Sequence, residues 1–324
     1  MWCFLREVNR EEAVISEKLI IGTRGSALAM TQSEWVARRI REHHPELRVE
    51  LAVIHTKGDI LQDVSLAVIG GKGVFIKEIE EELLRKKVDL AVHSMKDVPA
   101  ELPDPLEIAV TPPREDPRDV LISRGNRTLE ELPPGAKIGT GSIRRELQLK
   151  HHFSTLDIVP MRGNLDTRIK KLETEKLDGV IVAGAGLARM GWISRVSQFL
   201  PVDVIIPAVG QGVLAIETRR DDDRCREIVA CINDPVTFLE VGAERAFLKR
   251  LGGGCQLPIA AFAKKYGDKM VIDGMVGSLD GKVIIRERAE GEAKEYRAIG
   301  SGLAETILLR GGDALLAEIE SIRS

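Results

Sequence analysis

The chain has 324 residues, of which 44% are hydrophobic and 30% are charged, so at about 150 residues per domain it can hold two or three cores. With 47 basic and 50 acidic residues the net charge is −3, and aromatic residues make up only 4%. A basic excess and stacking aromatics are typical of nucleic-acid binders, so we expect no nucleic-acid partner. No apolar stretch approaches the ~20 residues of a membrane-spanning helix, so we expect no membrane partner either.

The N-terminal segment lacks the features of a targeting sequence. Residues 1–17 contain acidic side chains and no apolar core, which predicts an N-terminal extension rather than a signal or transit peptide. The four cysteines and six histidines fit no disulfide framework and no metal-ligand spacing. We therefore expect reduced thiols, no metal and a cytoplasmic location.

A short motif occurs twice, in residues 21–26 (IGTRGS) and 138–142 (IGTGS). Each copy follows an apolar run and begins a stretch with apolar residues at helical spacing. Each stretch then reaches a His-His pair and an extended segment, residues 49–54 in the first half and 156–161 in the second. The repeat predicts two similar domains, and the alternative is a chance likeness between two short strand–helix units.

Each half continues with another helix and another strand. Apolar residues at helical spacing from Phe75 onward precede a strand predicted at residues 88–92. A similar helix that begins near Leu165 precedes a strand predicted at residues 177–182. Strands that alternate with helices are typical of α/β domains with parallel-rich sheets, and we expect a cleft between two such domains.

Two segments rich in proline or glycine lie between these units. They are residues 111–117 (TPPREDP) and 207–212 (PAVGQG). Proline and glycine clusters interrupt regular structure, so both segments are predicted to cross between the two domains. Two crossing segments would form a double hinge, which suits closure over a ligand.

The C-terminal part differs in pattern. A helix predicted through Phe238, Val241, Ala246 and Leu248 ends at residues 252–254 (GGG). Apolar runs separated by Gly267-Asp268 and Asp280-Gly281 predict hairpins, and one helical stretch is predicted from Leu303 to Ile319. We expect a small α+β domain with an antiparallel sheet. The predicted domain limits are 18–112 with 213–231 for domain 1, 113–212 for domain 2 and 232–324 for domain 3.

Basic residues cluster where predicted strands end. They are Arg24, Lys96, Arg144, Arg145, Arg162 and Arg168. Ligands bind at such strand ends in open α/β sheets, and guanidinium groups bind carboxylates through paired hydrogen bonds. Ser142 and Asn164 precede two of the predicted helices and are candidate N-caps. The pattern predicts a ligand with several negative groups, and the alternative is that each arginine pairs with a nearby glutamate in solvent.

Two further side chains are candidates for chemistry. Asp97 is the one acid among the strand-end cations and could stabilise a developing positive charge, although residues 96–99 are also good turn formers. Cys255 follows a run of glycines, which allows close approach of a ligand to a nucleophile or an attachment point. The alternative for Cys255 is a buried apolar side chain, the role that we expect for Cys3, Cys225 and Cys231.

Nearly the whole chain resembles the porphobilinogen deaminase, or hydroxymethylbilane synthase, family. The resemblance rests on motifs in the family's order: IGTRGSALAMTQ, GGKGVFIKE, DLAVHSMKDVP, REDPRDV, IGTGSIRRELQL, RGNLDTR, AVGQG and GGGCQLPI. It implies an α/β fold with two similar periplasmic-binding-protein-like domains and a double hinge. A small α+β C-terminal domain with an antiparallel sheet completes the implied fold and bears Cys255.

The resemblance also implies a transferase activity. Members join porphobilinogen units head to tail onto a covalent dipyrromethane cofactor with loss of ammonia, and then hydrolyse off linear hydroxymethylbilane for haem-type tetrapyrroles. By this resemblance Cys255 attaches the dipyrromethane, Asp97 is the catalytic carboxylate, no metal takes part and the protein is a monomer. Positions that match cofactor- and substrate-binding residues are Arg24, Lys72, Lys96, Ser142, Arg144, Arg145, Arg162, Arg168 and Arg189.

The chain departs from the family pattern at two glycines, and two other functions compete. Gly141 stands where the family often has a serine, and Gly252 replaces a commoner acidic residue. One alternative is a two-domain binding protein for an acidic small molecule, which would leave Cys255 without a role. The other is a cysteine hydrolase, but none of the six histidines lies in a recognisable partner motif.

Overall fold

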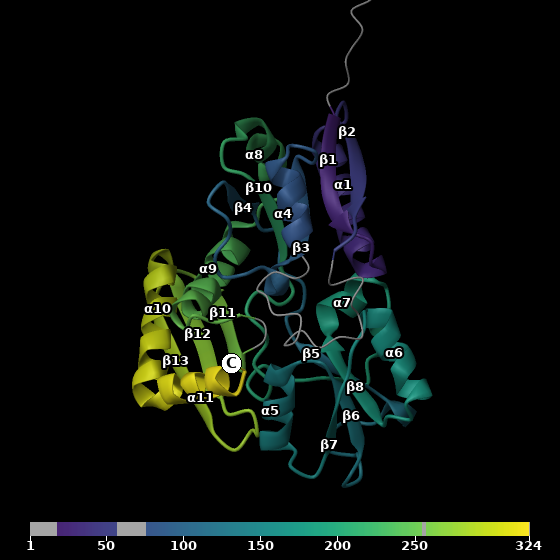
Figure 1. The fold of residues 1–324 in the computed structure, drawn as a ribbon, viewed down its shortest axis with the longest axis vertical. Coiled ribbons are helices and arrows are strands. Elements are labelled where there is room, and N and C mark those ends of the chain that lie inside the picture. Colours follow the sequence, from purple (N-terminus) through teal and green to yellow (C-terminus); the bar gives the residue numbers. More distant parts are fainter. Residues whose placement is uncertain (1–17, 57–75, 255–256, 324) are drawn as a thin grey trace, which may run out of the picture.

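The computed structural model describes residues 18–56, 76–254 and 257–323, and three β-sheets organise this part of the chain (Figure 1). The first sheet has the order β2-β1-β3-β10-β4. Its strands are β1 (Lys18–Arg24), β2 (Arg48–Ile54), β3 (Leu90–Ser94), β4 (Leu106–Val110) and β10 (Leu214–Arg219). Strand β1 runs parallel to β2 and β3, whereas β10 is antiparallel to both of its neighbours.

Helices cover both faces of the first sheet. Helix α1 (Ala27–His43) and helix α8 (Asp223–Ala230) pack on one face, where Ile21 and Val36 are fully buried. Helix α4 (Lys77–Leu84) packs on the other face through Ile79. Because both faces are covered, the central strands read as continuous apolar runs in the sequence.

The second sheet has the order β7-β6-β8-β5-β9. Its strands are β5 (Asp119–Ser123), β6 (Lys137–Thr140), β7 (Asp157–Pro160), β8 (Gly179–Ala183) and β9 (Gln198–Phe199). Three helices follow its parallel strands: α5 (Ile143–His152), α6 (Leu165–Thr174) and α7 (Gly184–Arg189). Leu149 of α5 and Ile169 of α6 belong to separate cores, one on each face of the sheet.

The two five-stranded sheets have the same topology, which confirms the predicted pair of similar α/β units. Strands β1, β2 and β3 correspond to β6, β7 and β8, and β4 corresponds to β9. The remaining strand of each sheet is antiparallel to its neighbours: β10 in the first and β5 in the second. Each sheet is therefore mixed, and its antiparallel strand begins directly after the chain has crossed from the other sheet.

The chain crosses between the two sheets twice, once between β4 and β5 and once between β9 and β10. The predicted crossing segments, residues 111–117 and 207–212, lie in these two connections. The strand positions do not fix the residues at which one domain ends and the next begins, so the three sets of domain limits stay predictions.

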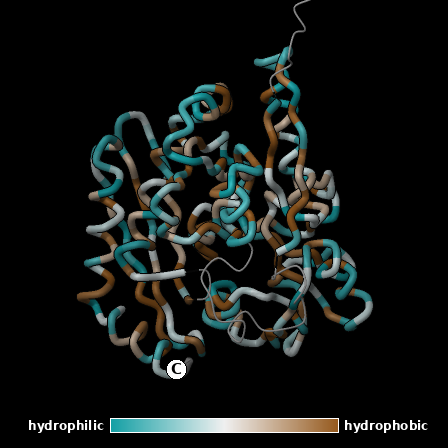
Figure 2. The backbone as a smooth tube through the Cα atoms, turned by 45° about the horizontal axis from the view of Figure 1, so that its top comes forward, coloured by the Kyte–Doolittle hydropathy of each residue, from teal (hydrophilic) through white to brown (hydrophobic). Residues whose placement is uncertain are grey.

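The third sheet is antiparallel and contains β11 (Ile259–Tyr266), β12 (Lys269–Gly277) and β13 (Ile284–Glu292). Helices α9 (Pro235–Arg250) and α10 (Tyr296–Ile307) bury Phe247 and Leu303 against it. Both predicted hairpin turns are confirmed, with Gly267 and Gly281 at positive φ values of 56° and 74°. Figure 2 shows hydrophobic and hydrophilic residues interspersed along the backbone.

Two predicted helices differ from those in the structure. In α9 the predicted apolar residue Phe238 is 36% exposed, whereas two carboxylates, Glu240 and Glu244, are buried. The predicted C-terminal helix is two helices, since a π-helical turn (Leu308–Gly312) separates α10 from α11 (Asp313–Arg323). Gly311 has a φ of 101° inside this turn, which interrupts the helical backbone.

Glu244 connects the third sheet to both crossing segments. Its carboxylate accepts a hydrogen bond from Arg114 Nη2 over 2.8 Å in the first crossing segment. It also accepts from the backbone N–H of Gly210 over 2.7 Å in the second, and from that of Ala263 in β11 over 2.9 Å. One buried carboxylate thus contacts three segments that lie far apart in the sequence.

Candidate functional site

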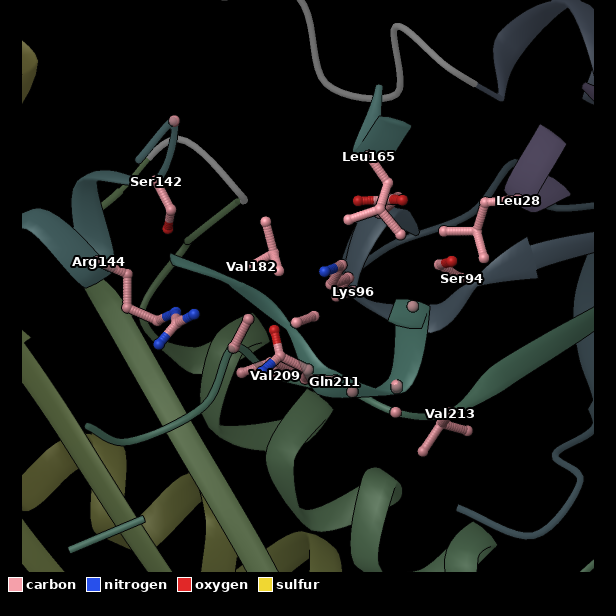
Figure 3. Close-up of a pocket in the computed structure, with 18 of the residues that line it drawn as sticks. Leu28, Ser94, Lys96, Ser142, Arg144, Leu165, Val182, Val209, Gln211 and Val213 are labelled. Carbon is pink, nitrogen blue, oxygen red and sulfur yellow. The ribbon is translucent and has the colours of Figure 1, made fainter. Parts of the chain in front are cut away.

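A cavity of about 300 Å³ lies where the three sheets meet. Its wall includes the end of β1, the 3₁₀ turn after β3, the first turns of α5 and α6, helix α7, the second crossing segment and the start of β11. Figure 3 shows the side chains of Lys96, Arg144 and Gln211 converging on this space. The strand ends of both α/β units therefore face one cavity, as expected for ligand binding in open sheets.

Most of the predicted site residues line this cavity. They are Arg24, Lys96, Asp97, Ser142, Arg144, Arg145, Arg168 and Arg189. Arg162 is described but does not line it. Lys72 and Cys255 lie outside the described residues, while Gly254, which directly precedes Cys255, forms part of the wall.

The turn after β3 positions Lys96 and Asp97. Met95 is buried and donates its backbone N–H to Val213 O, just after the second crossing segment, over 2.9 Å. A Cβ on Gly210 would lie 2.4 Å from Met95 Cγ, and Gly210 has a φ of 71°, so this position requires glycine. The close contact holds the turn against the second crossing segment. Asp97 also lines a smaller cavity of about 60 Å³ beside the first.

The two predicted N-caps do not cap their helices through their side chains. Ser142 and Asn164 stand at the N-cap positions of α5 and α6, but neither side chain makes a capping hydrogen bond. Ser26 does so for α1, by accepting from Ala29 N over 3.3 Å. The hydroxyl of Ser142 and the amide of Asn164 thus belong to residues that line the cavity without serving as caps.

The structure explains the two glycines that depart from the family pattern. A Cβ on Gly141 would lie 2.4 Å from the backbone oxygen of Met161, so this backbone leaves no room for a side chain. Gly252 has a φ of 67°, which favours glycine, although a Cβ at this position would meet no atom within 4 Å among the described residues. Both departures therefore match the local backbone.

Arg144 and Arg145 lie against a buried acid, Asp119, that was not among the predicted site residues. Asp119 Oδ2 is 2.7 Å from Arg144 Nη2, and Asp119 Oδ1 is 2.7 Å from Arg145 Nη2. Gln211 donates to the same carboxylate over 2.8 Å. Asp119 lies in the motif REDPRDV, but this motif was not connected with a role for the acid, because Asp119 begins an apolar strand and its arginine partners lie in another motif.

Burial and neighbouring charges shift several pKa values at the site. Burial lowers the pKa of Lys96 to about 8, and the nearby Arg145 lowers it too, whereas Asp97 and Asp119 act in the opposite direction. Burial also lowers the pKa of Arg168 and that of Arg189 to about 10. For Asp119, burial favours the neutral form, but the two arginines outweigh it and hold its pKa well below the ordinary value. Asp119 is therefore a carboxylate at any working pH.

This arrangement can bind a ligand with several carboxylates and stabilise a cation beside them. The guanidinium groups and the Lys96 ammonium supply charge-assisted hydrogen bonds, which are about twice as strong as neutral ones. Asp97 is the acid among the residues that line the cavity. A fixed carboxylate of this kind stabilises positive charge that develops during a reaction.

The two cysteines in the described part of the chain, Cys225 and Cys231, do not line the cavity. Cys225 is buried, and burial raises the pKa of its thiol to about 12, so it stays protonated. Burial also raises the pKa of Cys231. Within residues 18–56, 76–254 and 257–323, no group of His, Cys, Asp and Glu side chains could hold a metal ion. In the same ranges, none of the helices has the length and hydropathy needed to cross a membrane.

Known proteins resemble this chain over nearly its full length. Residues 19–227 match the family model described as porphobilinogen deaminase, dipyrromethane cofactor binding domain, and residues 238–309 match the porphobilinogen deaminase C-terminal domain. A porphobilinogen deaminase of Syntrophus aciditrophicus is 56% identical over 93% of this chain and 98% of its own. That of Syntrophotalea carbinolica is 48% identical over 94% and 97%.

Among solved structures, the methionine binding protein MetQ is 13% identical, with a TM-score of 0.42, over 68% of this chain and 92% of its own. The two family models together cover most of the chain, and the two relatives are far more similar than chance allows. The chain therefore belongs to the porphobilinogen deaminase family.

Proposed function

We propose that the protein is a hydroxymethylbilane synthase, which condenses porphobilinogen head to tail on a covalent dipyrromethane, releases ammonia and hydrolyses off linear hydroxymethylbilane. The observation that carries this proposal is the set of basic side chains that surround Asp97 in one cavity. Each pyrrole unit brings two carboxylates, so a growing chain needs many fixed cations. A noncatalytic binding protein would need the cations but not the acid.

The residues present fit a dipyrromethane. The cavity wall combines six basic side chains with the polar side chains of Ser142 and Asn164, which make no helix-capping hydrogen bond. In addition, Arg144 Nε is buried without a hydrogen-bond partner among the described residues. Arg24, Arg144, Arg145, Arg168 and Arg189 would hold the acetate and propionate groups, and we propose the same role for Arg162 and Lys72. When bound, the dipyrromethane supplies the pyrrole carbon that is extended.

Asp97 would act on the incoming porphobilinogen. Loss of ammonia leaves a positively charged azafulvene, and the Asp97 carboxylate is the acid in the cavity wall that can face this charge. Lys96, next to it in the same turn, would bind a substrate carboxylate and so place the reacting carbon near Asp97. The two neighbours would thus orient the substrate and stabilise the cation.

The attachment of the dipyrromethane to Cys255 gives the direct test of the function. We expect the intact mass of the purified protein to exceed the sequence mass by a two-pyrrole unit, and we expect Cys255→Ala to return it to the sequence mass and to abolish turnover. Cys225→Ala is the matched control and should keep the added mass, since Cys225 is a buried thiol that does not line the cavity. A wild-type protein of unmodified mass that turns over porphobilinogen would contradict this proposal.

The pKa of Lys96 predicts how the activity depends on pH. Above pH 8 the Lys96 ammonium loses its proton, because its pKa is about 8. We therefore expect kcat/KM for porphobilinogen to fall on the alkaline side with a midpoint near this pH. Lys96→Arg should move the alkaline limb upward by roughly one unit or more, because an arginine stays charged there. If the alkaline limb of the pH profile has the same midpoint in Lys96→Arg as in the wild type, a group other than Lys96 is responsible for the loss of activity.

Three further properties belong to the proposal. We propose a cytoplasmic monomer whose partner is the small molecule porphobilinogen, with no nucleic-acid or membrane partner. The net charge of −3 and the small share of aromatic residues support the proposal that no nucleic acid is bound. We also propose the domain limits 18–112 with 213–231, 113–212 and 232–324, with residues 1–17 as an extension. The sequence positions of the three sheets support these limits.

A further inference from the structure

Asp119 is a fully buried carboxylate at the basic wall of the cavity. It is the first residue of β5, directly after the first crossing segment. It contacts Arg144 and Arg145, and it accepts a hydrogen bond from Gln211 of the second crossing segment. Gln211 Nε2 also donates to Pro117 O over 2.7 Å, so the same amide joins the two crossing segments.

Both guanidinium groups are held on two sides. Arg144 Nη1 donates to the backbone oxygen of Ile206 over 2.6 Å while its Nη2 faces Asp119. Arg145 Nη1 donates to Ile181 O over 3.1 Å while its Nε and Nη2 face Asp119 over 3.0 and 2.7 Å. A guanidinium held by a carboxylate and a carbonyl loses its rotational freedom before any ligand arrives, which lowers the entropic cost of binding.

Three buried polar atoms in this assembly have no hydrogen-bond partner among the described residues: Asp119 Oδ2, Arg144 Nε and Gln211 Oε1. Asp119 Oδ2 still forms an ion pair with Arg144 Nη2 over 2.7 Å. The side chains of Arg144 and Gln211 line the cavity. Buried polar groups are paired in the great majority of folded proteins, so unpaired ones beside a cavity indicate contacts that a ligand or ordered water completes. Asp119 pairs with the Nη2 atoms of Arg144 and Arg145, and the Nε donor of Arg144 has no partner among the described residues.

Asp119 also sets the charge of this wall. Two guanidinium groups and one carboxylate leave one net positive charge. The pKa of Lys96 is lowered by burial and by Arg145 and Arg144 of α5. It is raised by Asp97 in the same turn and by Asp119 of β5. The Asp119 carboxylate thus favours the protonated form of Lys96, which the two arginines disfavour.

We propose that Asp119 is a positioning residue, whose carboxylate holds Arg144 and Arg145 in the orientation that receives ligand carboxylates while Gln211 ties this assembly to both crossing segments. The inference rests on the activity proposed above. Asp119 does not line the cavity, so it acts through the two arginines rather than on the ligand.

Asp119→Asn tests the proposal, because it keeps the shape and removes the charge. We expect the KM for porphobilinogen to rise roughly tenfold or more, since charge-assisted anchors of both arginines are lost. We also expect the alkaline limb of the pH profile to move to lower pH, since Lys96 loses a neighbouring negative charge. Asp119→Glu should recover part of the KM. An Asp119→Asn enzyme with wild-type KM and pH profile overturns the proposal, and so does a lower KM, which would mean that Asp119 only competes with the ligand.

Glu240→Gln is the matched control. It removes a similarly buried carboxylate that pairs with Arg114 and Lys264 rather than with arginines of the cavity. It should lower the melting temperature and leave the KM and the alkaline limb unchanged. If both were to move as in Asp119→Asn, loss of any buried carboxylate would explain the effect and the proposal would fail.

Gln211→Met keeps the test open if Asp119→Asn does not fold. This change removes both Gln211 donations without altering charge, so the KM must rise several-fold, and an unchanged KM overturns the proposal. The wild-type protein in the same assay separates the two hypotheses. Failure of wild-type turnover contradicts the proposed function, whereas an active wild type with unaffected variants contradicts only the role of Asp119.

Discussion

Replacing Asp97 with asparagine is expected to lower the rate of ammonia release by about 10²–10³-fold or more, with the fold retained. Asparagine keeps the shape of the side chain but removes the charge that would face the azafulvene cation. The 3₁₀ turn that contains Asp97 is held by Met95 and by its hydrogen bond to Val213, neither of which the substitution changes. Single-turnover ammonia release, with circular dichroism to check folding, measures the effect.

Asp97→Glu separates the catalytic role of Asp97 from a role in the turn. Glutamate keeps the charge and displaces it by one methylene, so this variant should retain more activity than Asp97→Asn. A turn former would give the opposite order, because asparagine serves turns as readily as aspartate. A fully active Asp97→Asn enzyme ends the catalytic assignment.

The largest effect on stability is expected at Glu244. Glu244→Gln leaves the buried Arg114 charge without its nearest partner, and breaking a buried ion pair on one side costs about 3–5 kcal/mol. Arg114 keeps Glu240, but at the longer distance of 3.7 Å. We expect the free energy of unfolding, measured by urea denaturation, to fall by about 3 kcal/mol.

A double-mutant cycle with Arg114→Met checks the origin of this loss. The double variant should be more stable than the sum of the two single losses predicts, because it leaves no unpaired charge. Glu305→Gln is the control: it breaks an exposed ion pair with Arg250 and should change the free energy of unfolding by less than about 1 kcal/mol. Additive losses in the cycle would show that Arg114 and Glu244 act independently.

The repeated units of the fold could be predicted from the sequence because their periodicity is local. The motifs at 21–26 and 138–142 lie where a strand passes into a helix in two equivalent strand–helix pairs, and the hairpin turns at Gly267 and Gly281 follow from turn chemistry. The antiparallel direction of β5 and β10 could not be predicted. An apolar run shows that a strand is buried but not which neighbours it pairs with, and those neighbours come from distant parts of the chain.

Most of the candidate site could also be predicted, because its cations follow strands and strand ends converge. Asp119 and Glu244 were missed for a common reason. Asp119 is the first residue of β5 and Glu244 lies within α9, and their partners, Arg145 and Arg114, lie 26 and 130 residues away in sequence. Sequence spacing carries no signal for such pairs. The predicted caps Ser142 and Asn164 were located correctly but do not cap, since an N-cap residue type does not determine where its side chain points.

The exchange of antiparallel strands between the two sheets has a consequence for the order of folding during translation. All strands of the second sheet lie between residues 119 and 199, so the ribosome delivers them as one uninterrupted segment. The first sheet begins at residue 18 but lacks β10, which lies between β3 and β4, until residue 219 has emerged. Domains that emerge first generally fold first, yet here the unit that starts later is complete earlier. Strands β3 and β4 therefore lack their shared neighbour β10 until all strands of the second sheet have been synthesised.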